Sequence, residues 1–172
     1  RTGIKERRIL DKGIGTSHMA IQAANTIIKK KKLDPTEIDL VVVATITPDM
    51  HATATAAYVA SEIGASNAFG FDISAACSGF LYGLSTASAF IESGRYKKII
   101  LIGADKMSSI VDYSDRNTCI IFGDGAGAVL LEPNIEGYGV KDEYLRSNGS
   151  NRDLLRIEAG GSQTPTTKNT VK

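Results

Sequence analysis

The sequence contains no tryptophan, only two cysteines and two histidines, and almost no net charge. With a formal net charge of +1 over 172 residues, the chain has no overall field that would favour nucleic acid, an anionic membrane or an acidic partner. Aromatic residues make up 6% of the chain, which argues against a surface that stacks the bases of single-stranded nucleic acid. No apolar run is long enough to span a bilayer. The shares of hydrophobic and charged residues, 42% and 23%, are typical of a globular protein with a packed core.

The scarcity of cysteine limits the chemistry further. Cys77 and Cys119 are far apart in the sequence and lack the paired spacing of a zinc site. We therefore expect no bound metal, no disulfide between them, and a reducing, cytoplasmic location. The sequence begins with Arg1 and stops in the polar stretch 164–172, and neither end is typical of the edge of a fold. We expect residues 1–172 to form one unit that is an incomplete piece of a longer protein.

Short apolar runs alternate with helical patterns along the first two thirds of the chain. Three runs rich in β-branched and aromatic residues predict buried strands, at residues 38–44, 69–73 and 97–103. Apolar residues at helical spacing predict helices at about 17–32, 52–63 and 76–93, the first with Thr16 or Ser17 as its N-cap. This alternation favours an α/β fold with a mostly parallel sheet and helices packed on its faces. Residues 126–131 and 138–144 predict two further strands, as an antiparallel addition.

The segment around Cys77 is the best candidate for a reactive site. It reads Asp-Ile-Ser-Ala-Ala-Cys-Ser-Gly-Phe over residues 72–80, and it passes from a predicted strand through small residues into a predicted helix. The first N–H groups of a helix have no internal partner, so they can stabilise a thiolate. A cysteine at such a turn is a candidate nucleophile. The alternative is that Cys77 is a small buried hydrophobic residue.

The helix alone does not make an efficient nucleophile. A free cysteine has a pKa of about 8.5, and a helix N-terminus contributes on the order of 0.3–1 kcal/mol, which is less than one pKa unit. A base or a second donor is therefore needed, and the two histidines are weak candidates. His18 falls in the first predicted helix and His51 in a loop, where each suits a surface or packing position. The sequence thus offers a nucleophile without an evident partner.

Four segments in order give the chain a resemblance to a known family. They are the segment around Cys77, the run Arg-Thr-Gly-Ile-Lys-Glu-Arg-Arg at 1–8, Asp-Arg-Asn-Thr at 115–118, and Phe-Gly-Asp-Gly-Ala-Gly-Ala at 122–128. Together they resemble the amino-terminal half of β-ketoacyl-acyl-carrier-protein synthase III, from Arg1 to about Leu155. The glycines at 123, 125 and 127 precede a predicted strand and do not open a helix, so they do not form a dinucleotide-binding fingerprint. Close backbone packing at a turn into a strand is the simpler interpretation.

The resemblance implies a thiolase-like fold, layered α/β/α/β/α, of which this chain supplies mainly the first of two similar halves. It implies an acyltransferase of fatty acid biosynthesis, usually a homodimer, that needs no cofactor besides its coenzyme A thioester substrate. Cys77 takes an acyl group from acyl-coenzyme A and the acyl-enzyme condenses with malonyl-acyl carrier protein, losing carbon dioxide. The family's histidine and asparagine, which stabilise the carbanion, are expected beyond Lys172, so this stretch alone is expected to be inactive.

The same resemblance implies roles for further residues. Arg1 and Arg116 correspond to arginines that hold coenzyme A, a task that suits the planar guanidinium because it binds phosphate oxygens and stacks on a purine. Without the resemblance, each is an ordinary surface arginine. Four apolar residues correspond to positions that line the acyl channel, although they serve equally well in a core: Met107, Ile121, Phe122 and Leu154.

One loop departs from the family pattern. The family usually has a bulky pair after Thr-Pro-Asp, where the partner subunit closes the acyl pocket, whereas this chain has Met50, His51 and Ala52. A small residue at position 52 predicts a wider pocket that accepts primers longer or more branched than acetyl.

Other functions remain open at this point. A related condensing enzyme of secondary metabolism carries a cysteine at the same turn. A non-catalytic partner subunit typically has that cysteine replaced, and a plain α/β binding module has it buried and inert.

Overall fold

The computed structural model describes residues 3–170 and contains one four-stranded sheet. The strands are β1 (Leu40–Ala44), β2 (Phe69–Ile73), β3 (Ile99–Lys106) and β4 (Asp124–Leu131), and they lie in the order β2-β1-β3-β4. β1 pairs in parallel with β2 and β3, while β4 runs antiparallel to β3. The predicted parallel strands are confirmed, with β3 reaching three residues further than expected. Of the two strands predicted as an antiparallel addition, the one at 126–131 is present as β4.

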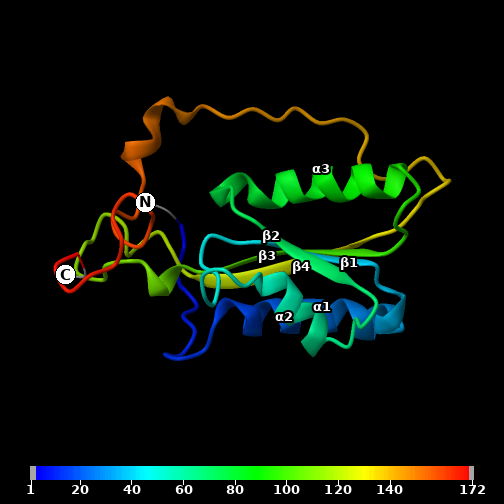
Figure 1. Cartoon of the computed structure of the whole chain (residues 1–172), viewed down its shortest axis with the longest axis horizontal. Helices are drawn as coiled ribbons and strands as arrows, with labels where there is room; N and C mark the ends of the chain where they lie inside the picture. The colour runs from blue at the N-terminus through cyan, green and yellow to red at the C-terminus, as the bar shows by residue number, and fades with distance from the viewer. Residues whose placement is uncertain (1–2, 171–172) are drawn as a thin grey trace.

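Helices cover both faces of this sheet (Figure 1). α1 (Thr16–Lys31) and α2 (Thr55–Glu62) lie on one face, and α3 (Gly79–Glu92) lies on the other. None of these helices is both long and apolar enough to cross a bilayer, within the part of the chain that the structure describes.

The core consists of two layers because β1 and β3 are buried on both faces. Val41 and Ile102 pack with the helices of one face, whereas Val42 and Leu101 pack with α3 on the other. Every residue of β1 is buried, as its continuous apolar run predicts. The layered α/β arrangement expected from the sequence is therefore present.

The helix starts depend on carboxylates that are distant in sequence. α1 begins after Gly15, so the prediction of Thr16 or Ser17 as N-cap is wrong. Asp49 accepts hydrogen bonds from the Ser17 N–H at 2.9 Å and from the Ser17 hydroxyl at 2.5 Å. A Cβ at Gly15 would lie 2.3 Å from Asp49 Oδ1, so only glycine fits there. The cap comes from a loop 32 residues away, which local sequence does not reveal.

α2 also begins later than predicted, at Thr55 and not near residue 52. Asp72, at the end of β2, accepts the N–H groups of Thr55 and Ala56 at 2.7 and 2.8 Å. These bonds satisfy the first orphan donors of the helix and fix its start.

The predicted strand at 138–144 is wrong. This segment belongs to an exposed, irregular stretch that crosses the outer side of α3 (Figure 1). Tyr82 on α3 holds its far end through Arg146 O at 3.1 Å and Ser147 Oγ at 2.7 Å. An apolar alternation becomes a strand only where another strand offers its N–H and C=O groups, and no described strand does so here.

Candidate active site

Cys77 lies in a tight turn between β2 and α3. The predicted helix from residue 76 does not start there, because residues Ala76–Ser78 form a short 3-10 turn and α3 begins at Gly79. Ala76 has a φ of 46°, in the left-handed region that costs a non-glycine residue about 1–2 kcal/mol. Strain of this kind is typical of functional turns. The Cys77 thiol is exposed and free, so a reagent can reach it.

Two glycines hold this turn close to the sheet. A Cβ at Gly79 would lie 3.3 Å from the Cβ of Ala44, and one at Gly83 would lie 2.5 Å from a methyl group of Leu101. Because these positions have no side chain, α3 packs directly on β1 and β3. The position of Cys77 is thereby fixed by close packing beneath α3.

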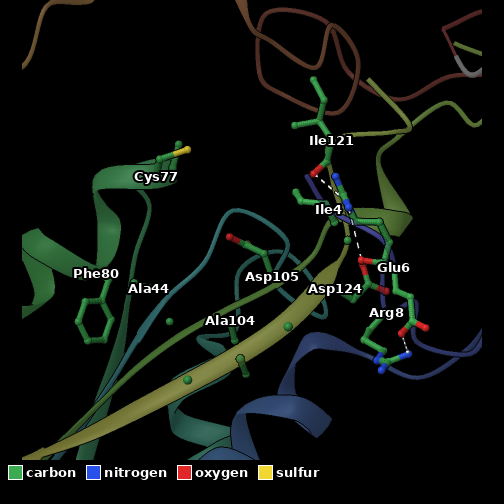
Figure 2. A pocket seen from close by; sticks show the side chains of 17 residues that line it. Ile4, Glu6, Arg8, Ala44, Cys77, Phe80, Ala104, Asp105, Ile121 and Asp124 are labelled. Carbon is green, nitrogen blue, oxygen red and sulfur yellow. Dashed lines mark hydrogen bonds and ion pairs between the residues drawn. The ribbon is translucent and has the colours of Figure 1, made fainter. Parts of the chain in front are cut away.

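Cys77 borders a cleft of about 600 Å³ at the carboxyl ends of the parallel strands. Ligands of open α/β sheets bind at this edge, because the loops that follow the strands converge there. In Figure 2, Cys77 stands on one side of the cleft, and Ile4 and Ile121 lie on the other, while the Glu6 side chain turns toward Arg8. The lining comes from the arm before α1, the ends of the strands, the turn before α3 and the start of β4: Ile4, Glu6, Arg7, Arg8, Ala44, Ala76, Cys77, Phe80, Gly103, Ala104, Asp105, Ile121, Gly123, Asp124, Gly125, Ala126 and Gly127.

Asp105 anchors the floor of the cleft to the loop after β1. Its Oδ1 accepts hydrogen bonds from the hydroxyls of Thr45 and Thr47, both at 3.0 Å, and from the Ile46 N–H at 2.8 Å. Thr45 and Thr47 are buried, so this carboxylate satisfies hydroxyls that would otherwise be costly to bury. The loop therefore leaves β1 in one fixed direction.

Asp124 joins three segments around the cleft. Its carboxylate accepts the Leu10 N–H at 2.8 Å and both the N–H and the hydroxyl of Ser108, at 2.8 and 2.6 Å. Burial favours the neutral acid, but the hydrogen bonds from Ser108 and Leu10 and the charge of Lys106 outweigh it. The pKa of Asp124 is therefore held below its ordinary value. An ionised Asp124 ties the arm before α1 to the turn after β3.

The predicted site residues divide into two groups. Cys77 and Ile121 line the same cleft, whereas the half-buried Phe122, next to Ile121 in the chain, does not. The other described residues do not line it: Met107 is half-buried, Arg116 is exposed, Leu154 is 83% exposed, and Ala52 is exposed in a loop with a φ of 73°. Arg1 lies outside the described residues.

Neither histidine lines the cleft. His18 shares a hydrogen bond with Gln22 one turn along α1, and His51 is exposed in the loop before α2. Among the described residues, no cluster of three or more potential metal ligands occurs. The described part of the cleft therefore holds a thiol without a histidine beside it.

Three cleft residues were missed from the sequence: Arg7, Asp105 and Asp124. Asp105 follows a predicted buried strand, a position where functional side chains collect in parallel sheets, so a signal for it existed. Asp124 lies in the glycine-rich segment 122–128, but the sequence alone assigned it no role. Of that segment's glycines, Gly123 packs against Arg7, as expected for close packing, whereas a Cβ at Gly125 or Gly127 would meet nothing within 4 Å.

Known proteins with similar sequences point to one family. Residues 71–149, which include Cys77 and the start of β4, match the family model of 3-oxoacyl-[acyl-carrier-protein (ACP)] synthase III. A β-ketoacyl-[acyl-carrier-protein] synthase III from Bacteroides thetaiotaomicron is 54% identical over 99% of this chain and 51% of its own length. One from Chlorobaculum tepidum is 56% identical over 99% of this chain and 53% of its own length. The chain spans about half the length of the curated relatives it matches.

Solved structures show the same fold. The 3-oxoacyl-[acyl-carrier-protein] synthase III of Aquifex aeolicus superposes with a TM-score of 0.75 and 47% identity, over 79% of this chain and 44% of that one. Another 3-oxoacyl-(acyl-carrier-protein) synthase III reaches a TM-score of 0.90 over 99% of this chain and 51% of that one, at 26% identity. Over nearly its whole length, the chain is therefore a homologue of β-ketoacyl-[acyl-carrier-protein] synthase III, with the thiolase-like fold of that family, and it corresponds to about half of such a protein.

Proposed function

We propose that the full-length protein is an acyltransferase that starts fatty acid synthesis through an acyl-Cys77 intermediate. The observation that carries this proposal is the exposed Cys77 thiol, held on a strained turn at the edge of a cleft, in a chain whose relatives are named β-ketoacyl-ACP synthase III. We propose that the reaction takes place in the cytoplasm, where its thioester substrates are soluble.

The chemistry proceeds in two steps. Cys77 gives up its proton, and its thiolate attacks the carbonyl carbon of an acyl-coenzyme A. A new C–S bond forms, the C–S bond to coenzyme A breaks, and coenzyme A leaves as a thiolate that takes up a proton in place of the one that Cys77 lost. Malonyl-acyl carrier protein then loses carbon dioxide, and the resulting carbanion attacks the acyl-Cys77 carbonyl. A C–C bond forms and the Cys77 thiolate leaves. Since no histidine lines the described cleft, we assign carbanion stabilisation to a histidine and an asparagine outside this chain.

The remaining site residues extend the proposal. Arg1 and Arg116 are proposed to hold coenzyme A, and the apolar residues Met107, Ile121, Phe122 and Leu154 to border the acyl chain. Met107, Arg116 and Leu154 do not line the described cleft, so this role requires an acyl channel and a coenzyme A site larger than that cleft, completed by the rest of the protein.

We also propose a homodimer in which Ala52 of one subunit closes the acyl pocket of the other. Ala52 is small and exposed, so the pocket accepts primers longer or more branched than acetyl. A series of acyl-coenzyme A substrates of increasing length tests this. Strict preference for acetyl would contradict it.

The main test is acylation of the thiol. Full-length protein exposed to acetyl-coenzyme A is expected to gain one acetyl group, and peptide mapping is expected to find it on Cys77. Cys77→Ser abolishes the labelling. Cys119→Ser is the matched control, because Cys119 is the other free cysteine and does not line the cleft, so labelling stays at the wild-type level. An unmodified wild-type protein would favour a binding module or a non-catalytic subunit.

One alternative has specific support. The priming β-ketosynthase of the R1128 polyketide pathway shares 40% identity with this chain over 78% of its length. Cys77 is expected to be acylated whether this protein starts fatty acid synthesis or polyketide synthesis, so the acylation test does not separate these two functions. Condensation assays with malonyl groups on a fatty acid carrier and on a polyketide carrier do, and exclusive use of the second would replace the proposed pathway.

A further inference from the structure

Besides the backbone contacts of the arm before α1 with Asp124, one side chain of this arm, Arg7, binds a wall of the cleft. Its guanidinium donates from Nε to the Ile121 carbonyl at 3.1 Å and from Nη2 to the Ile120 carbonyl at 2.5 Å. These bonds join positions 113 and 114 residues apart in the sequence. In Figure 2, the dashed line at Ile121 marks the bond that its backbone oxygen accepts, across the cleft from Cys77.

The wall needs this support because it has little regular structure. Residues 116–123 lie in turns and irregular backbone between β3 and β4. Their backbone hydrogen bonds are local, such as Cys119 N–H to Asp115 O at 3.0 Å and Ile121 N–H to Thr118 O at 3.0 Å. Local turns do not fix the position of the wall relative to the arm before α1. The bonds from Arg7 join the wall and the arm directly.

A glycine makes room for this contact. A Cβ at Gly123 would lie 3.2 Å from Cδ of Arg7 and 3.2 Å from the Arg8 carbonyl oxygen. The stem of Arg7 therefore packs directly on the backbone of Gly123. Arg7 is half-buried although its neighbours Glu6 and Arg8 are exposed, and its guanidinium donates to the carbonyl oxygens of Glu6, Ile120 and Ile121. Arginine suits this arrangement because its rigid fork satisfies two acceptors at once.

We infer that Arg7 is a positioning residue for acyl transfer, which fixes the Ile120–Ile121 wall of the cleft opposite Cys77. This inference rests on the proposed function. It assigns to the Arg7 guanidinium the hydrogen bonds that hold residues 120 and 121 of the wall against the arm. A shift of about 1 Å in such a wall can cost on the order of a hundredfold in rate, because the reacting carbonyl is then misplaced.

The test compares three variants of the full-length protein. Arg7→Ala removes the donors, Arg7→Lys keeps the charge but loses the fork, and Lys5→Ala is a control in the same exposed arm, outside the cleft lining. Two measurements are made on each: hydrogen exchange of peptides covering residues 116–123, and acylation of Cys77 by acetyl-coenzyme A. Alkylation of Cys77 by iodoacetamide serves as the reference, because a small reagent does not need the wall.

We expect faster exchange at 116–123 in both Arg7 variants and a fall of about tenfold or more in kcat for acylation by acetyl-coenzyme A, with KM changed far less. Iodoacetamide alkylation and the Lys5→Ala variant remain at wild-type values. Wild-type behaviour of Arg7→Lys would overturn the inference, because charge alone would then suffice. Unchanged exchange, or unchanged acylation despite faster exchange, would overturn it too.

These outcomes are separate from the fate of the proposed function. A wild-type protein that acetyl-coenzyme A does not acylate would refute acyl transfer itself. The exchange measurement needs no substrate, so it would still decide whether Arg7 holds the wall.

Discussion

At the scale of single residues, backbone strain marks the turn that carries Cys77. Ala76 has a positive φ directly before the exposed Cys77, and alanine tolerates this conformation better than a branched residue would. The small side chain also leaves the cleft open, since Ala76 is part of its lining. The turn therefore exposes the Cys77 thiol although its backbone is strained. The packing of α3 on the sheet stabilises this strained conformation.

This strain predicts different effects of two substitutions at Ala76. Ala76→Val is expected to lower the free energy of unfolding by about 1–3 kcal/mol and to slow iodoacetamide alkylation of Cys77, because a β-branched residue resists a positive φ. Ala76→Gly is expected to be nearly neutral, since relief of about 1 kcal/mol of strain is offset by the greater freedom of glycine in the unfolded chain. Urea unfolding and alkylation rates measure both. Equal behaviour of the two variants would show that the turn is not strained.

At the scale of elements, α1 and α2 are each started by an aspartate from elsewhere in the fold. Asp49 lies in the loop after β1, and Asp72 lies in β2. Each cap therefore links a helix to the sheet layer. The helices therefore depend on the sheet for their first turn, and the sheet positions them in return.

Loss of such a cap has a predictable cost. Asp72→Ala is expected to reduce the free energy of unfolding by about 1–2 kcal/mol, because the Thr55 and Ala56 N–H groups lose their acceptor. Asp142→Ala is the matched control, since that exposed carboxylate accepts only from its neighbour Glu143 among the described contacts. Chemical unfolding of both variants provides the comparison, and equal stability would contradict the capping role.

At the scale of the whole molecule, the cleft exists only where distant segments meet. Asp124 binds the arm at Leu10 and the turn at Ser108, while Arg7 binds the wall at Ile120 and Ile121. These contacts hold separate loops together around the open cleft that Cys77 borders.

The Asp124 contacts predict acid sensitivity. Because the folded pKa of Asp124 lies below its ordinary value of 3.8, its ionised form stabilises the protein above that pH, and this stability is lost as the pH falls through the folded pKa. Asp124→Asn is expected to lower Tm at neutral pH, with a difference from wild type that shrinks as the pH drops below about 4. Thermal unfolding across pH 2–7 measures it. A constant difference would show that ionisation of Asp124 is not involved.

The sequence by itself determined the alternation of strands and helices, the two-sided burial of β1 and the place of Cys77 at a strand-to-helix turn. These features depend on local periodicity and on a short motif, so they can be read without the fold. The aspartate caps, the absence of the strand predicted at 138–144 and the hydrogen bonds of Arg7 to Ile120 and Ile121 were decided only by the tertiary structure. Each depends on a partner that is distant in the sequence or on a neighbouring strand, and hydrogen bonds of that kind leave no periodic trace in the chain.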